Sequence, residues 1–139
     1  MTADTTKGQV LVFFALILPI ALLPIAAYAV DATVVASRVS GLQAATTEAA
    51  ETGAQQLNVD AIRSTGALEL DAAALFNVVA QTLVDEEPGA RVDSYDVTGT
   101  EVTVDTSEPV TLPLSVFTRS ITLHAHATAR LVAGYDKPV

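Results

Sequence analysis

The strongest hydrophobic pattern in this chain lies near its N-terminus. Between Val10 and Val30 no residue is charged, and 13 of these 21 residues are Leu, Ile, Val or Phe. At about 1.5 Å per residue, a helix of this length measures roughly 31 Å, which matches the bilayer core of about 30 Å. The pattern therefore predicts a membrane-spanning helix from Val10 to Val30 that contains Phe13, with a bend or local loosening at Pro19 and Pro24.

A cleaved signal peptide is the alternative interpretation of this segment. Lys7 precedes the apolar run, and Ala27-Tyr28-Ala29 fits a small-x-small cleavage site. The run is longer than the core of a usual signal peptide, which has about 7–15 residues. We therefore favour a retained anchor, while cleavage after Ala29 would release a secreted, acidic binding module. A membrane-tethered binding or sensory domain is the other alternative.

Helical spacing continues beyond the apolar run. The spaced positions are Val35, Val39, Leu42, Thr46, Ala49, Gly53 and Leu57. One interpretation is an amphipathic helix that lies on its own domain. The other is a stalk that continues the span and packs against neighbouring copies, because small residues let helix backbones approach. The second interpretation assigns the packing face or its flank to Leu42, Gln43, Ala45, Ala49 and Gly53, and predicts that Gly53→Leu blocks assembly without blocking insertion.

The second half of the chain predicts one helix and about three antiparallel strands. After a break at 58–70, Asp71 is a candidate N-cap for a helix that reaches Glu87. Its predicted buried stripe consists of Leu75, Val78, Val79, Thr82 and Leu83, and the acidic run at its end is interpreted as a solvated helix end.

Strands are predicted at 91–98, 101–106 and 120–132. In the last one, Ile121 and the alternate residues that follow share one face, and the alanines among them indicate a helix lying close above. Pro109 and Pro113 make 110–114 an edge or a crossing loop. The predicted fold class is α+β: a leader at 1–8, a membrane and stalk helix at 9–57, and a small domain at 58–139.

Charge and composition exclude several functions. From Asp31 onward there are 15 Asp and Glu against 6 Lys and Arg, a net charge of −9. This balance argues against nucleic acid as a partner and against an electrostatic contact with anionic lipid. The chain has no cysteine, so disulfides and thiolate ligands are excluded.

Candidate chemistry is limited to two histidines. His124 and His126 point the same way on the predicted strand and could supply two metal ligands, but a carboxylate ligand would have to come from another strand. Ser120, the nearest serine, has no recognisable acid beside it. We interpret the histidines as solvated, and we predict no catalytic residue, metal, cofactor or small-molecule substrate.

Three segments resemble the TadE/TadG-like proteins of the tight adherence (Flp type IVb) pilus machinery. They are KGQVLVFFALILP from Lys7, AVD at 29–31, and GLQAATTEAAETGA at 41–54, the more specific part. The resemblance covers about residues 7–57. It implies a single-pass protein of the bacterial inner membrane, N-terminus inside and domain outside. Such a protein acts as a minor pilin or pseudopilin-like subunit, or as an anchored assembly factor, with other pilus subunits as partners through its N-terminal helix.

The same resemblance implies a processing site. TadE-like members resemble prepilins that a dedicated peptidase cuts after a glycine. The matching glycine is Gly8, which would make Gln9 the new N-terminus. Prepilins of this kind usually carry Glu five residues after the cut, and Phe13 stands there instead. This departure favours the TadG-like members, which look like anchored factors that keep their leader.

Overall fold

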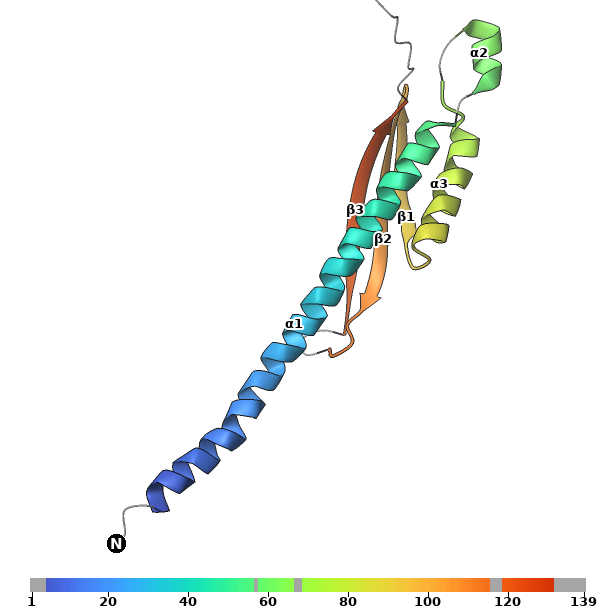
Figure 1. Cartoon of the computed structure of the whole chain (residues 1–139). Coiled ribbons are helices and arrows are strands. Elements are labelled where there is room, and N and C mark those ends of the chain that lie inside the picture. The colour runs from blue at the N-terminus through green and yellow to red at the C-terminus, as the bar shows by residue number, and fades with distance from the viewer. Residues whose placement is uncertain (1–4, 57, 67–68, 116–118, 132–139) are drawn as a thin grey trace, which may run out of the picture. The chain divides into compact units, whose positions relative to one another are not determined.

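The computed structural model describes residues 5–56, 58–66, 69–115 and 119–131. Its elements are α1 (Thr5–Ala54), α2 (Val59–Thr65), α3 (Ala72–Glu86), β1 (Arg91–Thr98), β2 (Glu101–Thr111) and β3 (Ser120–Arg130). A long N-terminal helix is thus followed by a small domain with a helix and three antiparallel strands (Figure 1), which confirms the predicted α+β class.

Helix α1 has 50 residues and continues through both Pro19 and Pro24. It begins at Thr5, inside the predicted leader, and ends at Ala54 rather than at Leu57, which lies outside the described residues. The absence of a terminator between the apolar run and the Ala-rich segment explains its continuity, because Ala, Leu, Gln and Glu are all good helix formers.

The chain divides into two compact units, and α1 contributes to both. The first comprises Met1–Ala36 and Thr111–Ile121, and the second comprises Ser37–Val110 and Thr122–Val139. The predicted boundary at 57/58 is therefore wrong for the second part of α1, which belongs to the compact unit of the sheet.

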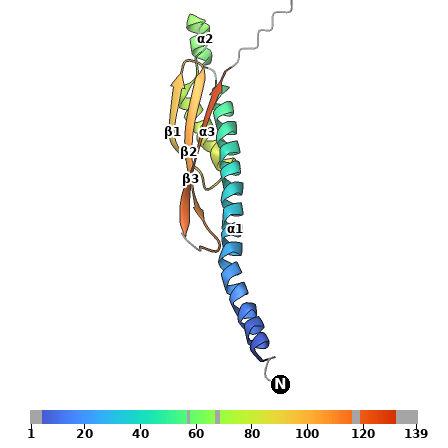
Figure 2. The same ribbon diagram turned by 90° about the vertical axis from the view of Figure 1, so that its left-hand side faces the viewer.

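The second unit has two layers. Its sheet has the order β1-β2-β3, and β1 and β2 form a hairpin in which Thr98 pairs with Glu101. The turn is closed by Gly99, whose φ of 65° suits a residue without a Cβ. Figures 1 and 2 show α3 and the part of α1 from Ser37 onward along one face of this sheet.

The core lies between these helices and the sheet. Asp71 accepts hydrogen bonds from the amides of Ala73 and Ala74 and so begins α3, as predicted. The predicted stripes are also confirmed where they are buried: Leu75, Val79 and Leu83 on α3, Leu42, Thr46, Ala49 and Gly53 on α1, and Leu123, Ala125 and Ala127 on β3.

A buried pair of hydroxyl groups joins α1 to the central strand. Thr46 Oγ1 donates to the carbonyl of Leu42 at 2.6 Å and lies 2.6 Å from Thr106 Oγ1. Since the Thr46 hydroxyl has only one hydrogen, Thr106 is the donor in the second bond. Both hydroxyl groups are therefore satisfied inside the core, as burial requires.

The structure differs from the predicted elements in three segments. The break at 58–70 contains α2, which is capped by Asn58 and by the left-handed Gly66 but buries no side chain, so it leaves no hydrophobic stripe to detect. Strand β2 continues through Pro109 to Thr111. The β1–β2 pairing stops at Ser107, so the missing N–H of Pro109 interrupts no bond to β1. The predicted last strand ends at Arg130, and Val132 lies outside the described residues.

Gly53 marks the closest approach of α1 to α3. A Cβ at this position would lie 2.7 Å from Val79 Cγ2 and 3.5 Å from Leu75 Cγ. Val79 is fully buried, and a β-branched side chain in a helix has one strongly preferred rotamer, so it cannot turn aside. Glycine is therefore required here for close helix packing.

We predict that Gly53→Leu destabilises the domain by about 3 kcal/mol, because overpacking a rigid core outweighs the gain in helix propensity. Denaturant unfolding of the full chain in detergent micelles measures this change. Ala44→Leu is the matched control, since Ala44 is exposed on the same part of α1. Equal stability of the two variants would contradict the close packing.

Candidate functional site

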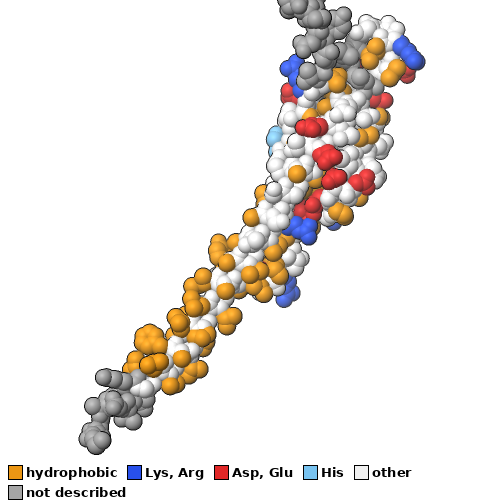
Figure 3. Space-filling view, in the orientation of Figure 1, with side chains coloured by type: hydrophobic (Ala, Val, Ile, Leu, Met, Phe, Trp, Pro, Cys, Tyr) orange, Lys and Arg blue, Asp and Glu red, His pale blue; other side chains and the backbone are white. Residues whose placement is uncertain are grey.

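The apolar part of α1 is exposed along its length, except at the half-buried Ala27. Side chains on every side of the helix from Val10 to Val30 face outward, including Phe13 at 65% exposure, and Pro19 and Pro24 are exposed as well. Figure 3 shows orange side chains projecting along this part of the helix, with white backbone between them. Among the described residues, one helix, Val10–Ala54, is long and apolar enough to cross a membrane. A helix that is hydrophobic all round needs an apolar environment, which a bilayer supplies.

Both candidate processing sites lie within α1. Gly8 is exposed and has nothing near its Cβ position, while the side chain of Gln9 is outside the described residues. Ala29 is exposed in the middle of the same helix. Cleavage at either position stays a prediction.

Asp31 ends the apolar run and is buried. Its Oδ1 accepts the backbone N–H of Leu114 at 3.0 Å, and both residues belong to the first compact unit. The partner comes from the connection between β2 and β3, 83 positions away. The sequence places Asp31 at the boundary of the span, but it does not reveal this contact.

The predicted helix-packing residues are used inside the chain. Leu42, Ala45, Ala49 and Gly53 are buried in the second unit. Gln43 is exposed and donates from Nε2 to the carbonyl of His126 on β3 at 3.0 Å. The interpretation of a helix on its own domain is therefore correct for these four residues, and packing of the helix against neighbouring copies stays a prediction.

The same finding corrects the expected effect of Gly53→Leu. Its side chain would collide with Leu75 and Val79 of the same chain. The substitution would therefore act on folding of the domain, before any contact with another subunit.

The face of the sheet opposite the helices carries two histidine–aspartate pairs. His126 Nδ1 lies 2.6 Å from Asp105 Oδ1, and His124 Nδ1 lies 3.6 Å from Asp93 Oδ2. Both carboxylates also accept a serine hydroxyl, from Ser94 and Ser107 respectively. The hydrogen bond from His126, followed by the bond from Ser94, lowers the pKa of Asp105 below its usual value.

This arrangement does not activate a nucleophile. The Ser94 hydroxyl donates to Asp105 rather than to an imidazole, so the histidine cannot remove its proton. No group of three or more metal-ligating side chains is found among the described residues. The sequence missed both acids because strand pairing brings them to the histidines. The alternation of Glu101, Thr103 and Asp105 with Val102 and Val104 is the sequence signal that indicates a polar face for Asp105.

A second charged cluster joins α1 to the start of the sheet. Arg38 Nη1 lies 2.6 Å from Glu87 Oε1 and 3.6 Å from Glu108 Oε1. Glu108 is buried on β2, and its Oε2 has no hydrogen-bond partner within the described structure. Burial and then the charge of Glu87 raise the pKa of Glu108, while Arg38 opposes the increase. The predicted solvated helix end is thus wrong for Glu87, which is half-buried in an ion pair.

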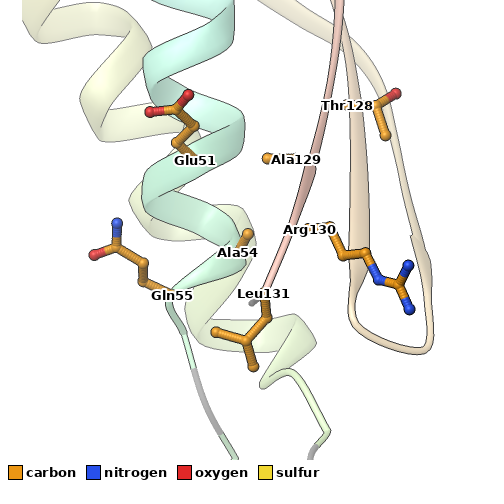
Figure 4. A pocket seen from close by; sticks show the side chains of 7 residues that line it. All are labelled: Glu51, Ala54, Gln55, Thr128, Ala129, Arg130 and Leu131. Carbon is orange, nitrogen blue, oxygen red and sulfur yellow. The ribbon is translucent and has the colours of Figure 1, made fainter. Parts of the chain in front are cut away.

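An open groove of about 490 Å³ lies between the end of α1 and the end of β3. In Figure 4, Ala54, Ala129 and Leu131 line the space between helix and strand, while Glu51 and Arg130 point away from it. A small-molecule site normally combines an apolar pocket with convergent polar groups. Gln55 and Thr128 also line this groove, but in Figure 4 the polar side chains do not converge on it.

Comparison of the chain with models of protein families, with curated proteins and with solved structures finds no match.

We predict that Glu108→Gln stabilises the protein by about 1 kcal/mol at pH 7, because it removes a buried charge with an unsatisfied oxygen. The native pKa of Glu108 is raised above its ordinary value of 4.5. The folded wild-type protein therefore binds the proton of Glu108 more tightly than the unfolded chain does. The stability of the wild type decreases as pH rises through the native pKa, because the buried carboxyl group then becomes charged. The stability difference between variant and wild type should shrink as pH falls toward 4.5.

Denaturant unfolding between neutral and acidic pH measures this difference. Glu101→Gln is the control, since Glu101 is an exposed carboxylate on the same strand. A difference that stays constant with pH for Glu108→Gln would contradict the raised pKa.

Proposed function

We propose that this protein is a non-catalytic, single-pass membrane component of a type IVb pilus or a related secretion system. Its N-terminus lies in the cytoplasm and its acidic domain lies outside the inner membrane. It acts there as a minor pilin or pseudopilin-like subunit, or as an anchored assembly factor. The pilus assignment rests on the TadE/TadG-like residues at 7–57, and the anchor rests on α1.

One observation carries the proposal. A single uninterrupted helix supplies both an exposed apolar segment of membrane length and a buried face of the domain core. The same backbone therefore continues from the anchor to the residues that hold the sheet, such as Leu42 and Thr46. This construction suits a subunit that is positioned by its helix.

The arrangement of the polar side chains supports a role without catalysis. In the described structure, Asp93 and Asp105 are held by serine hydroxyls and histidines, and Arg38 is paired with Glu87. These groups connect strands or join a helix to the sheet. Such contacts stabilise a domain rather than prepare a proton transfer.

Phe13 supports an anchor that is not a standard prepilin. Its ring is exposed among apolar neighbours, where a glutamate would be costly in lipid. An anchored factor that keeps its leader fits this residue better than a subunit that needs a buried carboxylate in a filament.

The intact mass of the protein from the membranes of its native host tests the proposal. The full-length chain, with or without Met1, supports the anchored factor. Loss of residues 1–8 supports a processed, pilin-like subunit, which should then be present in sheared filaments. Loss of residues 1–29 would overturn the anchor and support the secreted module.

The pilus role has its own test. Deletion of the gene in the native host should remove surface filaments, and the wild-type chain should restore them. Normal filaments in the deletion strain would contradict the pilus assignment and leave the anchor untouched.

We further predict that the double variant Leu18→Arg/Leu22→Arg loses membrane insertion. Each arginine at the centre of a span costs about 3 kcal/mol, so the pair offsets the roughly −4 to −8 kcal/mol supplied by the apolar residues. Extraction of membranes with alkaline carbonate measures the retained fraction. Ala44→Arg/Glu48→Arg, exposed on the second part of α1, is the matched control. Equal retention of both variants would contradict the span.

A further inference from the structure

We propose that the segment 112–115, which follows β2, lies in the membrane–water interface and contacts lipid through Leu114. This inference rests on the proposed membrane anchor. It adds a second, apolar contact with lipid, outside the span, made by residues more than 80 positions away from Asp31.

The position of Leu114 relative to the span is fixed by a hydrogen bond. Its amide donates to Asp31 Oδ1 at 3.0 Å, and Asp31 directly follows Val30, the last residue of the apolar run. The Cα–Cβ bond of a helical residue is tilted toward the helix N-terminus. The Asp31 carboxylate therefore reaches back toward the span, and it holds Leu114 beside the last turn of that span.

The covered residues of α1 lie at the same point along the helix as the contact with Leu114. Among the described side chains of α1 from Val10 to Ala36, Ala27 and Asp31 are the first two that are not exposed, and Val34 and Val35 follow them. Ala27 and Asp31 are separated by one helical turn and lie on the same face of α1. The first unit thus has one covered patch on α1, at the outer end of the span.

The connection presents apolar surface at this level. Leu112 is buried, whereas Pro113 is exposed and Leu114 is 50% exposed. Ser115 has a φ of 51°, and its hydroxyl donates to the carbonyl of Leu112 at 2.8 Å. A non-glycine residue at positive φ is strained and persists only where its surroundings hold it. The turn that leaves Leu114 outward is therefore a fixed feature of the structure.

The charge at the base of the connection suits a lipid surface. The N–H of Leu112 donates to the carbonyl of Arg119 at 3.0 Å, which closes the connection, and Arg119 is exposed. An exposed arginine whose backbone is bonded to Leu112 suits an interface in which phosphates lie above acyl chains. The contact is local and mainly apolar, so the net charge of −9 does not oppose it.

Lipid is the occupant that this geometry favours. The exposed surface of Pro113 and Leu114 adjoins the proposed span, which is surrounded by acyl chains. The hydrogen bond to Asp31 keeps Leu114 beside the end of that span. A partner protein at the same place is the competing occupant, and vesicles that contain only lipid and this chain separate the two.

The chain has no cysteine, so single cysteine variants can carry an environment-sensitive fluorophore at one site. The full chain is labelled at Leu114→Cys, at Leu22→Cys in the span, or at Thr98→Cys in the β1–β2 hairpin of the second unit. Each variant is reconstituted into phosphatidylcholine vesicles with a nitroxide quencher either near the headgroup or near the chain ends. Circular dichroism confirms that each labelled variant is folded.

We expect the headgroup-level quencher to reduce the emission at Leu114 about twofold, and the deep quencher to act less. Leu22 should show the reverse preference, and Thr98 should respond to neither. Asp31→Ala, added to the Leu114→Cys variant, should abolish most of the quenching because the connection is no longer held at the span.

The controls distinguish the interfacial contact of Leu114 from the proposed membrane anchor. If Leu22 is quenched but Leu114 behaves like Thr98, the interfacial contact is overturned and the anchor stands. If Leu22 itself is not quenched, the proposed anchor fails. Quenching at Leu114 that is unchanged by Asp31→Ala would overturn the role given to the hydrogen bond.

Discussion

Close packing of the second part of α1 against the sheet and α3 is the contact on which the domain depends. It requires small residues on α1, and Gly53 is the extreme case, because Val79 occupies the space that a Cβ would need. The buried Thr46–Thr106 pair then fixes the helix over the central strand. A domain with one other substantial helix over three strands has a small core, so the loss of this face would leave little apolar burial.

The two parts of α1 satisfy opposite requirements with one backbone. The first part is hydrophobic on all sides and exposed, while the second has a stripe that is buried against its own domain. Asp31 lies where the apolar run ends, and its carboxylate contacts the connection from β2 to β3 within the first unit. A charged residue is favourable there only because it combines a hydrogen bond with a place outside the apolar run.

The polar residues outside the span serve mainly to join elements. The pairs Asp105–His126 and Asp93–His124 lie across the strands, and Arg38 connects α1 to Glu87 after α3. Glu108 is the exception, because one of its oxygen atoms is buried without a hydrogen-bond partner among the described residues. Burial raises the pKa of this carboxyl group, which is why we expect its contribution to stability to depend on pH.

The sequence by itself determined the local features. Continuous hydrophobicity from Val10 to Val30 defined the apolar helix, Asp71 marked the start of α3, and alternation in β3 showed its buried face, since these patterns depend on neighbouring residues. Only the tertiary structure decided which surface the stripe of α1 contacts, where Glu87 and Glu108 meet Arg38, and which acids reach the histidines. Arg38 and Glu87 are 49 positions apart in the sequence, Gln43 and His126 are 83 positions apart, and strand pairing brings the acids to the histidines. Periodicity shows that a face is buried, but only the packing of distant segments determines what buries it.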